Sequence, residues 1–172
     1  IYTQCGTAES MNAFYCPADQ MLYLAPDIAA VFSSELQPES IAYEWIMAHE
    51  YGHAIEGRIG VMSAHFNLAL DSSDDVELEL SRRLELQADC FAGMTVRSLS
   101  QSLQLTEADH DRAADVAYEL GDDSLAARFG MDQELPGDHG SGKNRMLWNE
   151  RGMATNAVAE CNTWTANQNE VR

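Results

Sequence analysis

The sequence has very little positive charge. Its 172 residues include 28 acidic residues but only 10 basic ones, of which Lys143 is the single lysine, and the net charge at pH 7 is −18. Nucleic acids and anionic membrane surfaces are therefore not expected as partners, because both require basic protein surface. No apolar run reaches the roughly 18 residues that a membrane-spanning helix needs. The chain opens at Ile1 rather than methionine, so we expect a missing segment before it, such as a signal peptide or a membrane anchor.

The cysteines lack the C-x-x-C spacing of zinc ribbons and thioredoxin-like redox motifs. Four are present, at positions 5, 16, 90 and 161. An even number in an acidic, lysine-poor chain indicates disulfides and an oxidising compartment, either extracellular or periplasmic. Four cysteines allow three pairings. The short loop favours Cys5–Cys16, which leaves Cys90–Cys161, although Cys90 is also compatible with a thiol buried on a helix.

The chain does contain enough apolar residues to form a core. Hydrophobic residues make up 45% of it, and its length suits one domain over residues 1–172. We predict strands at 12–16 and 21–24 and helices at 26–36, 40–59, 75–103, 106–120 and 141–161. Residues 60–73 and 136–142 are expected to be loops, and the tail after Trp164 to be frayed. This order predicts an α+β fold, mostly helical, with a small sheet packed against the 40–59 helix.

An acidic cluster lies before the predicted 75–103 helix. We interpret it as the solvated start of that helix, because acidic side chains suit helix N-termini, with a calcium site as the alternative. Its members are Asp71, Asp74, Asp75, Glu77 and Glu79.

The sequence His49-Glu50-Tyr51-Gly52-His53 is an H-E-x-x-H motif inside the predicted 40–59 helix. The four-residue step puts both imidazoles on one helical face, one turn apart, where they can bind one metal ion. Zinc suits this arrangement because it accepts neutral imidazole and carboxylate ligands and can keep its fourth position open. Such a metal lowers the pKa of a bound water from ~16 towards ~7, and Glu50 could complete the deprotonation. The alternative is a helix with two histidines and no metal.

A third ligand is available on the 75–103 helix. Glu85 and Asp89 are four residues apart and project from the same face. Glu85 can complete a zinc site of two histidines and one carboxylate, with one zinc ion per chain. Asp89 can then accept the second ring N–H of a ligand histidine and fix its tautomer. Arg82 and Arg83 stand beside this pair, so a plain charged helix face is the alternative.

These two motifs together resemble the gluzincin metallopeptidases. Residues 84–93, Leu-Glu-Leu-Gln-Ala-Asp-Cys-Phe-Ala-Gly, resemble more narrowly the putative neutral zinc metallopeptidase family of bacteria, as do residues 14–20 and the sequence His139-Gly140-Ser141. These blocks span nearly the whole chain in the expected order. The resemblance implies a zincin-like peptidase domain, often behind an N-terminal hydrophobic segment.

Two further blocks resemble the neprilysin-like gluzincins. Residues Asn12, Ala13 and Phe14 are similar to their substrate-binding edge strand, to which a peptide can add as another strand. His139 and Arg145 are similar to their paired histidine and arginine. The resemblance implies that His139 donates to the oxyanion and that Arg145 holds a substrate carbonyl or carboxylate.

The sequence departs from that pattern between Ser141 and Arg145. There it has Gly142-Lys143-Asn144, whereas the pattern predicts serine and glutamine near positions 142 and 144. The same loop nearly matches a phosphate-binding loop, but Asn144 stands where serine or threonine is required, and we reject that interpretation. His65 and His110 have no motif around them and are expected at the surface.

We therefore predict a zinc-dependent peptidase that hydrolyses a peptide bond by metal-activated water, with Glu50 as the base. The first alternative is a catalytically silent, zinc-containing module that binds peptides. Intact Glu50 and His139 argue against it, because a structural zinc site needs neither. The second alternative is a hydrolase of non-peptide amides, against which the edge strand favours peptides.

Overall fold

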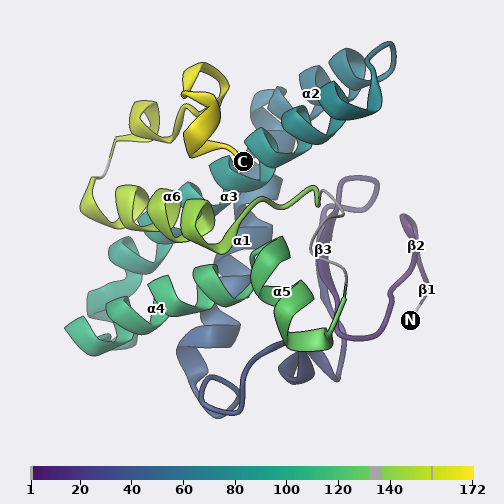
Figure 1. Cartoon of the computed structure of the whole chain (residues 1–172). Coiled ribbons are helices and arrows are strands. Elements are labelled where there is room, and N and C mark those ends of the chain that lie inside the picture. The colour runs from purple at the N-terminus through teal and green to yellow at the C-terminus, as the bar shows by residue number, and fades with distance from the viewer. Residues whose placement is uncertain (1, 132–136, 156) are drawn as a thin grey trace.

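One long helix carries the H-E-x-x-H motif through the middle of the molecule (Figure 1). The computed structural model describes residues 2–131, 137–155 and 157–172. In it, α1 (Ser40–Ile59) packs against α3 (Asp74–Leu103), α4 (Glu107–Glu119) and the strand β3 (Ala13–Cys16). Helix α6 (Gly142–Ala154) packs across α3 and α4. The other elements are β1 (Tyr2–Thr3), β2 (Gly6–Thr7), β4 (Met21–Leu24), α2 (Val61–Ala69), α5 (Asp122–Phe129), and the 3-10 helices η1 (Ile28–Val31), η2 (Val158–Cys161), η3 (Thr163–Thr165) and η4 (Gln168–Glu170).

The predicted fold class is confirmed, since the chain is mostly helical and its small sheet lies beside α1. Strand β3 pairs antiparallel with β4, with Ala13 opposite Leu24 and Cys16 opposite Met21. A second, shorter hairpin joins β1 and β2, which sequence analysis did not predict. Disulfide Cys5–Cys16 ties this hairpin to the end of β3. Within the described residues, no strand pairs with the second edge of β3.

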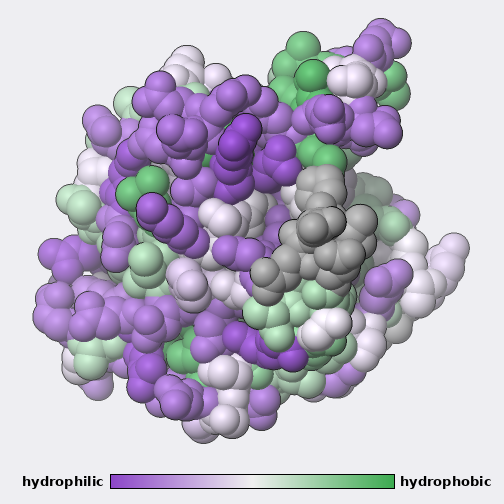
Figure 2. Space-filling model, viewed as in Figure 1, coloured by the Kyte–Doolittle hydropathy of each residue, from purple (hydrophilic) through white to green (hydrophobic). Residues whose placement is uncertain are grey.

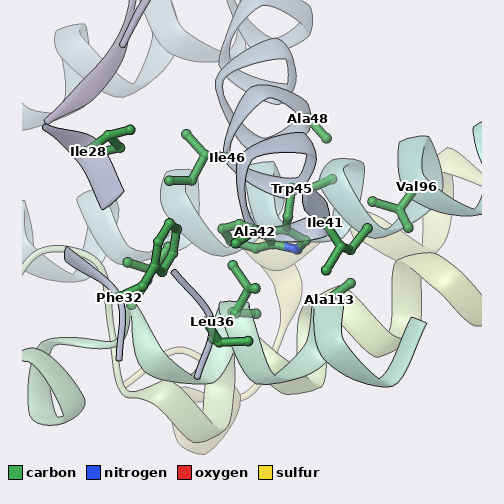
Figure 3. Packing of buried hydrophobic residues seen from close by; sticks show 14 residues of the cluster. Ile28, Phe32, Leu36, Ile41, Ala42, Trp45, Ile46, Ala48, Val96 and Ala113 are labelled. Carbon is green, nitrogen blue, oxygen red and sulfur yellow. The ribbon is translucent and has the colours of Figure 1, made fainter. Parts of the chain in front are cut away.

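The hydrophobic core lies where α1 meets α3 and α4 (Figure 3). Trp45 and Ile41 of α1 are almost fully buried there, next to Val96 of α3 and Ala113 of α4. These α1 positions follow the helical spacing that the sequence predicted. The core therefore holds in place the same helix that carries the motif.

Helices α3 and α6 cross at two glycines. A Cβ atom added to Gly93 would lie 2.1 Å from the carbonyl oxygen of Asn149, and one added to Gly152 would lie 2.0 Å from that of Cys90. Any side chain at either position would force the helices apart. This close crossing brings the α6 face that carries Arg145 against the α3 face that carries Asp89.

Three predicted boundaries are confirmed closely. Helix α1 spans the predicted 40–59, α3 begins one residue earlier than predicted, and α4 begins at the capping box of Thr106 with Asp109. Asp74, Asp75 and Glu77 occupy the first turn of α3, in agreement with the helix-start interpretation of the acidic cluster.

The prediction of a polar loop at 60–73 was wrong, because residues 61–69 form α2. Gly60, in a left-handed conformation (φ 86°), ends α1 and turns the chain into this helix. Met62 and His65, three residues apart, are buried on one face of α2, which packs on α3. The expectation that His65 lies at the surface is thereby corrected. His110 is half-buried and contacts Ser100.

The predicted 26–36 helix was also wrong, because only a 3-10 turn forms at Ile28–Val31. Phe32 is extended after it, and the Glu119 carboxylate accepts hydrogen bonds from the N–H and hydroxyl of Ser33. This contact with a distant helix fixes Ser33 after the 3-10 turn, and a separate hydrogen-bonded turn follows at residues 34–38. Sequence analysis likewise missed α5, which begins directly after the predicted stop at Gly121.

The C-terminal region differs most from the prediction. The helix expected over 141–161 ends at Ala154, and Cys161 instead lies in η2, bonded to Cys90 on α3. The tail is docked rather than frayed: Val171 is buried, and the carbonyl of Arg172 accepts a hydrogen bond from the Asn144 side chain. The predicted loop at 136–142 is confirmed for residues 137–141, while residue 136 lies outside the described ranges.

The face seen in Figure 2 is largely hydrophilic, as the net charge implies. An apolar patch stands out over the projecting α2, where Phe66, Leu68 and Leu70 are exposed. None of the helices in the described ranges is both long and apolar enough to cross a membrane.

Candidate metal centre and active site

Two helices bring the three expected metal ligands together. His49 and His53 project from α1, and Glu85 projects from α3. One ligand atom from each lies within 4.8 Å of the other two. The Nε2 atoms of His49 and His53 lie 3.2 Å and 3.4 Å from the two carboxylate oxygens of Glu85. This cluster of two imidazoles and one carboxylate is the donor set that zinc prefers.

The opposite nitrogen of each imidazole is held by another carboxylate. His49 Nδ1 lies 2.8 Å from Asp89 Oδ1, and His53 Nδ1 lies 2.8 Å from Glu56 Oε2. With Nδ1 donating, each neutral ring keeps its Nε2 lone pair for a metal. The residues therefore fit a zinc ion by both donor type and orientation.

The charges around the cluster favour an added positive charge. Burial opposes ionisation of Glu56 and raises the pKa of its carboxyl to about 7, although His53 works in the other direction. Burial also lowers the pKa of the His53 imidazole, but Glu85 and Glu56 outweigh it and leave that pKa well above its usual value. Burial raises the pKa of Glu85, yet the neighbouring imidazoles of His53 and His139 leave it well below its usual value. A divalent cation would satisfy the same carboxylates.

A fully buried ion pair supports His49 from behind. Arg145 donates from Nε to Asp89 Oδ2 over 2.9 Å and from Nη2 to Asp89 Oδ1 over 2.8 Å. Its Nη1 donates to the carbonyl of Leu120 over 2.7 Å. Burial disfavours the charge on Asp89, but Arg145 and His49 hold the pKa of its carboxyl below its usual value. Among the described residues, three of the five N–H groups of Arg145 thus donate to Asp89 and Leu120, and Nη2 also lies 3.5 Å from His49 Nδ1.

A small cavity of about 170 Å³ joins several of the predicted residues. Its walls include Glu50 and His49 from α1, Arg145 from α6 and His139 from the loop before α6. Asn12 and Ala13 from the N-terminal hairpin also line it, whereas Phe14 does not and stacks on Tyr23 with ring centroids 5.3 Å apart. The edge strand, Glu50 and His139 therefore face one space.

Successive residues along β3 turn their N–H and C=O groups alternately towards β4 and towards the open edge. The N–H of Ala25 donates to the carbonyl of Asn12 over 2.8 Å, so Asn12 forms a hydrogen-bonded pair with the neighbouring chain. In an antiparallel ladder the next residue turns its N–H and C=O outward. Ala13 therefore offers its peptide groups on the side away from β4, where an extended peptide can pair with them.

His139 is held in place by Asp122, at the start of α5. The Asp122 Oδ2 atom accepts hydrogen bonds from the backbone N–H groups of His139 and Gly140, over 3.1 Å and 2.8 Å. His139 Nδ1 also lies 2.9 Å from Asp138 Oδ1. Burial lowers the pKa of His139, but Asp122, Asp138 and Glu85 raise it to about 10. These carboxylates therefore favour the protonated imidazole.

Asp122, Asp138 and His139 also have ligand atoms within 4.8 Å of one another. The side chains of His139 and Asp138 are 44% and 62% exposed, and a hydrogen-bonded ion pair accounts for the cluster.

Two residues that support the site were missed by sequence analysis. Glu56 follows His53 by three residues, so the spacing of one helical turn is a signal for it in the sequence. Asp122 precedes His139 by seventeen residues, and no local pattern links them. The structure also contains the two disulfides that sequence analysis favoured, Cys5–Cys16 and Cys90–Cys161, and these indicate an oxidising environment.

Comparison with known proteins identifies a family that is consistent with this cluster of ligands. The family model described as "Putative neutral zinc metallopeptidase" matches residues 1–164. The "Uncharacterized protein YpfJ" of Escherichia coli K12 is 32% identical over 166 residues, which cover 94% of this chain and 58% of the relative. The "Uncharacterized protein Rv2575" of Mycobacterium tuberculosis H37Rv is 30% identical over 180 residues, which cover 96% of this chain and 60% of that protein. The chain thus spans about three fifths of these relatives. No solved structure matches it significantly.

Proposed function

This chain belongs to the putative neutral zinc metallopeptidase family, and from that premise we propose that it hydrolyses peptide bonds with one zinc ion per chain. The observation that carries the proposal is the pair of histidines on α1 whose Nδ1 atoms are both held by carboxylates, while both Nε2 atoms meet Glu85. That orientation serves metal binding. Zinc, when bound, would acidify a water molecule and polarise the substrate carbonyl.

Glu50 is the proposed general base. It follows the ligand His49 on α1 and lines the same cavity as His139 and Arg145. It would take a proton from the attacking water and pass it to the leaving amine. Glu50 is not a proposed ligand and forms no ion pair with any residue that the structure describes, so its carboxylate is available for this task.

His139 is the proposed donor to the oxyanion, and Arg145 the residue that positions the substrate. The contacts with Asp122 and Asp138 support a charged His139, which stabilises a developing negative charge better than a neutral donor. Arg145 would hold a substrate carbonyl through the N–H groups that do not donate to Asp89 or Leu120. Asn12, Ala13 and Phe14 would bind the substrate backbone along the edge of β3.

Two other functions would use the same metal site. A silent, zinc-containing peptide-binding module would need the ligands and the edge strand but not Glu50. A hydrolase of non-peptide amides would need Glu50 but not the open edge of β3. The joint presence of Glu50, His139 and a strand edge on one cavity favours the peptidase. Because the chain has two disulfides, we place this activity outside the cytoplasm, in the extracellular space or the periplasm.

The test is cleavage of a diverse peptide pool by the zinc-loaded protein, with and without a chelator, read by mass spectrometry. Glu50→Gln should keep its zinc but lose about 100- to 10,000-fold in rate, because it removes only the base. Glu35→Gln, the same change on an exposed residue, serves as the matched control. A His53→Ala, Glu85→Ala double variant should lose its zinc.

Each outcome separates the candidates. Equal cleavage by wild type and Glu50→Gln would refute the mechanism. Full zinc with no cleavage of any peptide or amide would favour the binding module. Full zinc content in the His53→Ala, Glu85→Ala variant would refute the ligand assignment.

A further inference from the structure

A second, larger cavity lies on the opposite face of α1. It is a groove of about 710 Å³ between α1 and α3. Its α1 wall includes residues 44, 47, 48, 51 and 55, which share one helical face, with Tyr43 at the margin. His49 and His53 lie about half a helical turn away from the centre of that face, and Glu50 about a third of a turn away. The groove is therefore separate from the candidate active site.

Helices α1 and α3 approach closely beside the groove. A Cβ atom added to Gly52 would lie 3.0 Å from the Cα atom of Ala88, so the helix axes approach closely there. Larger side chains line the groove on both sides. Met47 and Tyr51 on α1 are 40% and 45% exposed, and Leu99 and Leu103 on α3 are 42% and 45% exposed. Apolar side chains left this accessible in one place mark a binding surface rather than scattered exposure.

One carboxylate interrupts the apolar lining. Glu44 lies at the groove, and its Oε2 atom is buried with no hydrogen-bond donor among the described residues. A buried acceptor without a donor is costly. A basic group brought by a ligand would satisfy this oxygen, and a chain with a net charge of −18 attracts basic ligands in general.

We propose that this groove binds an amphipathic, basic helix of a partner protein. Two adjacent helices offer a groove into which the side chains of a third can pack, with anchors at i, i+3 or i+4, and i+7. Met47 and Met94 line it, and their flexible thioethers adapt to different apolar anchors. A lysine or arginine beside those anchors pairs with Glu44. A second copy of this chain fits poorly, because its charge of −18 repels an equal charge.

The probe is a fluorescent synthetic helix of about 18 residues with leucine anchors at this spacing and one lysine beside them. The control peptide has the same composition in scrambled order. We expect saturable binding of the amphipathic peptide, seen as fluorescence anisotropy at physiological salt, and at least about tenfold weaker binding of the scrambled one. Equal binding of both would mean attraction by charge alone and would overturn the proposal.

Variants locate the site. Met47→Glu and Leu99→Glu should each weaken binding by at least about tenfold, since each puts a charge into the apolar contact. Val76→Glu, the same kind of change at a 47% exposed position on α3 outside the groove, should leave binding unchanged. If Val76→Glu weakens binding as much as Leu99→Glu does, the peptide binds elsewhere and the assignment fails.

Glu44→Gln tests the charge pairing. It should weaken binding of the lysine peptide but not of a peptide with norleucine in place of lysine. An equal effect on both peptides would refute the role of Glu44. Sedimentation of the protein alone is measured in parallel, and a dimer that Met47→Glu dissociates would replace the proposed partner by a second copy. Zinc content and cleavage are independent readouts, so failure here leaves the proposed function untouched.

Discussion

Removal of the Asp89 carboxylate should lower the free energy of unfolding more than removal of a carboxylate from an exposed ion pair. Asp89 is 0% exposed and receives two hydrogen bonds from Arg145, which is itself 3% exposed, as well as the contact with His49 Nδ1. Asp89→Ala leaves a buried guanidinium without its counter-ion, and breaking a buried pair in this way costs about 3–5 kcal/mol. A domain of this kind has a total stability of about 5–15 kcal/mol, so the loss is a large part of it.

The assay is urea unfolding of the zinc-free protein with both disulfides intact, so that loss of zinc binding does not add to the result. The matched control is Asp115→Ala on α4, which removes an ion pair to Arg112 whose N–O distance is 3.4 Å and whose side chains are 57% and 41% exposed. Its cost should be about 0–1 kcal/mol. The double variant Asp89→Ala, Arg145→Met should recover part of the loss. A cost below about 1 kcal/mol for Asp89→Ala would refute the desolvation argument.

Three further results are expected. Glu56→Ala should weaken zinc binding about 10- to 100-fold in a chelator competition, because it frees the His53 ring, whereas Glu56→Gln should keep most of the affinity. In the zinc-free protein, the His139 resonance should titrate near pH 10 by NMR, and lower in Asp138→Asn. Because folding raises the pKa of His139, its protonated form contributes stability that is fully present below about pH 6.5 and is lost as the pH rises through 10. Titration of the His139 resonance near pH 6.5 would contradict the contacts with Asp122 and Asp138. Reduction of Cys90–Cys161, 71 residues apart, should cost about 4 kcal/mol in the chain-entropy model, and an unchanged urea midpoint would contradict it.

The parts of the fold and site that the sequence predicted are those encoded by local spacing. The H-E-x-x-H step and the Glu85–Asp89 step each place two side chains on one helical face, and capping by Thr106 marks a helix start within four residues. The family resemblance added His139 and Arg145, which no local pattern relates to the metal ligands. Their positions depend on the α3–α6 crossing and on the loop held by Asp122.

The errors came from contacts between distant segments. Residues 26–36 were predicted to form one helix, yet the chain is extended at Phe32 and Glu119 binds Ser33. The last helix stops early because Cys161 is bonded to Cys90, and a continuous helix would carry it elsewhere. Helix α2 was missed for a different reason: its apolar residues do not lie on one buried face, since Phe66 and Leu68 are exposed while Met62 and His65 are buried.

The candidate site lowers stability because it buries several ionisable side chains, and a disulfide, a close helix crossing and a buried tryptophan lie beside it. Cys90, whose disulfide fixes η2 to α3, directly follows Asp89. Gly93, one turn further along α3, sets the close crossing with α6, the helix that carries Arg145. Trp45, one turn before His49 on α1, is fully buried in the core and stacks on its ring. Each group that orients a proposed ligand is therefore attached to a constrained backbone, which is the arrangement that preorganised metal and catalytic sites require.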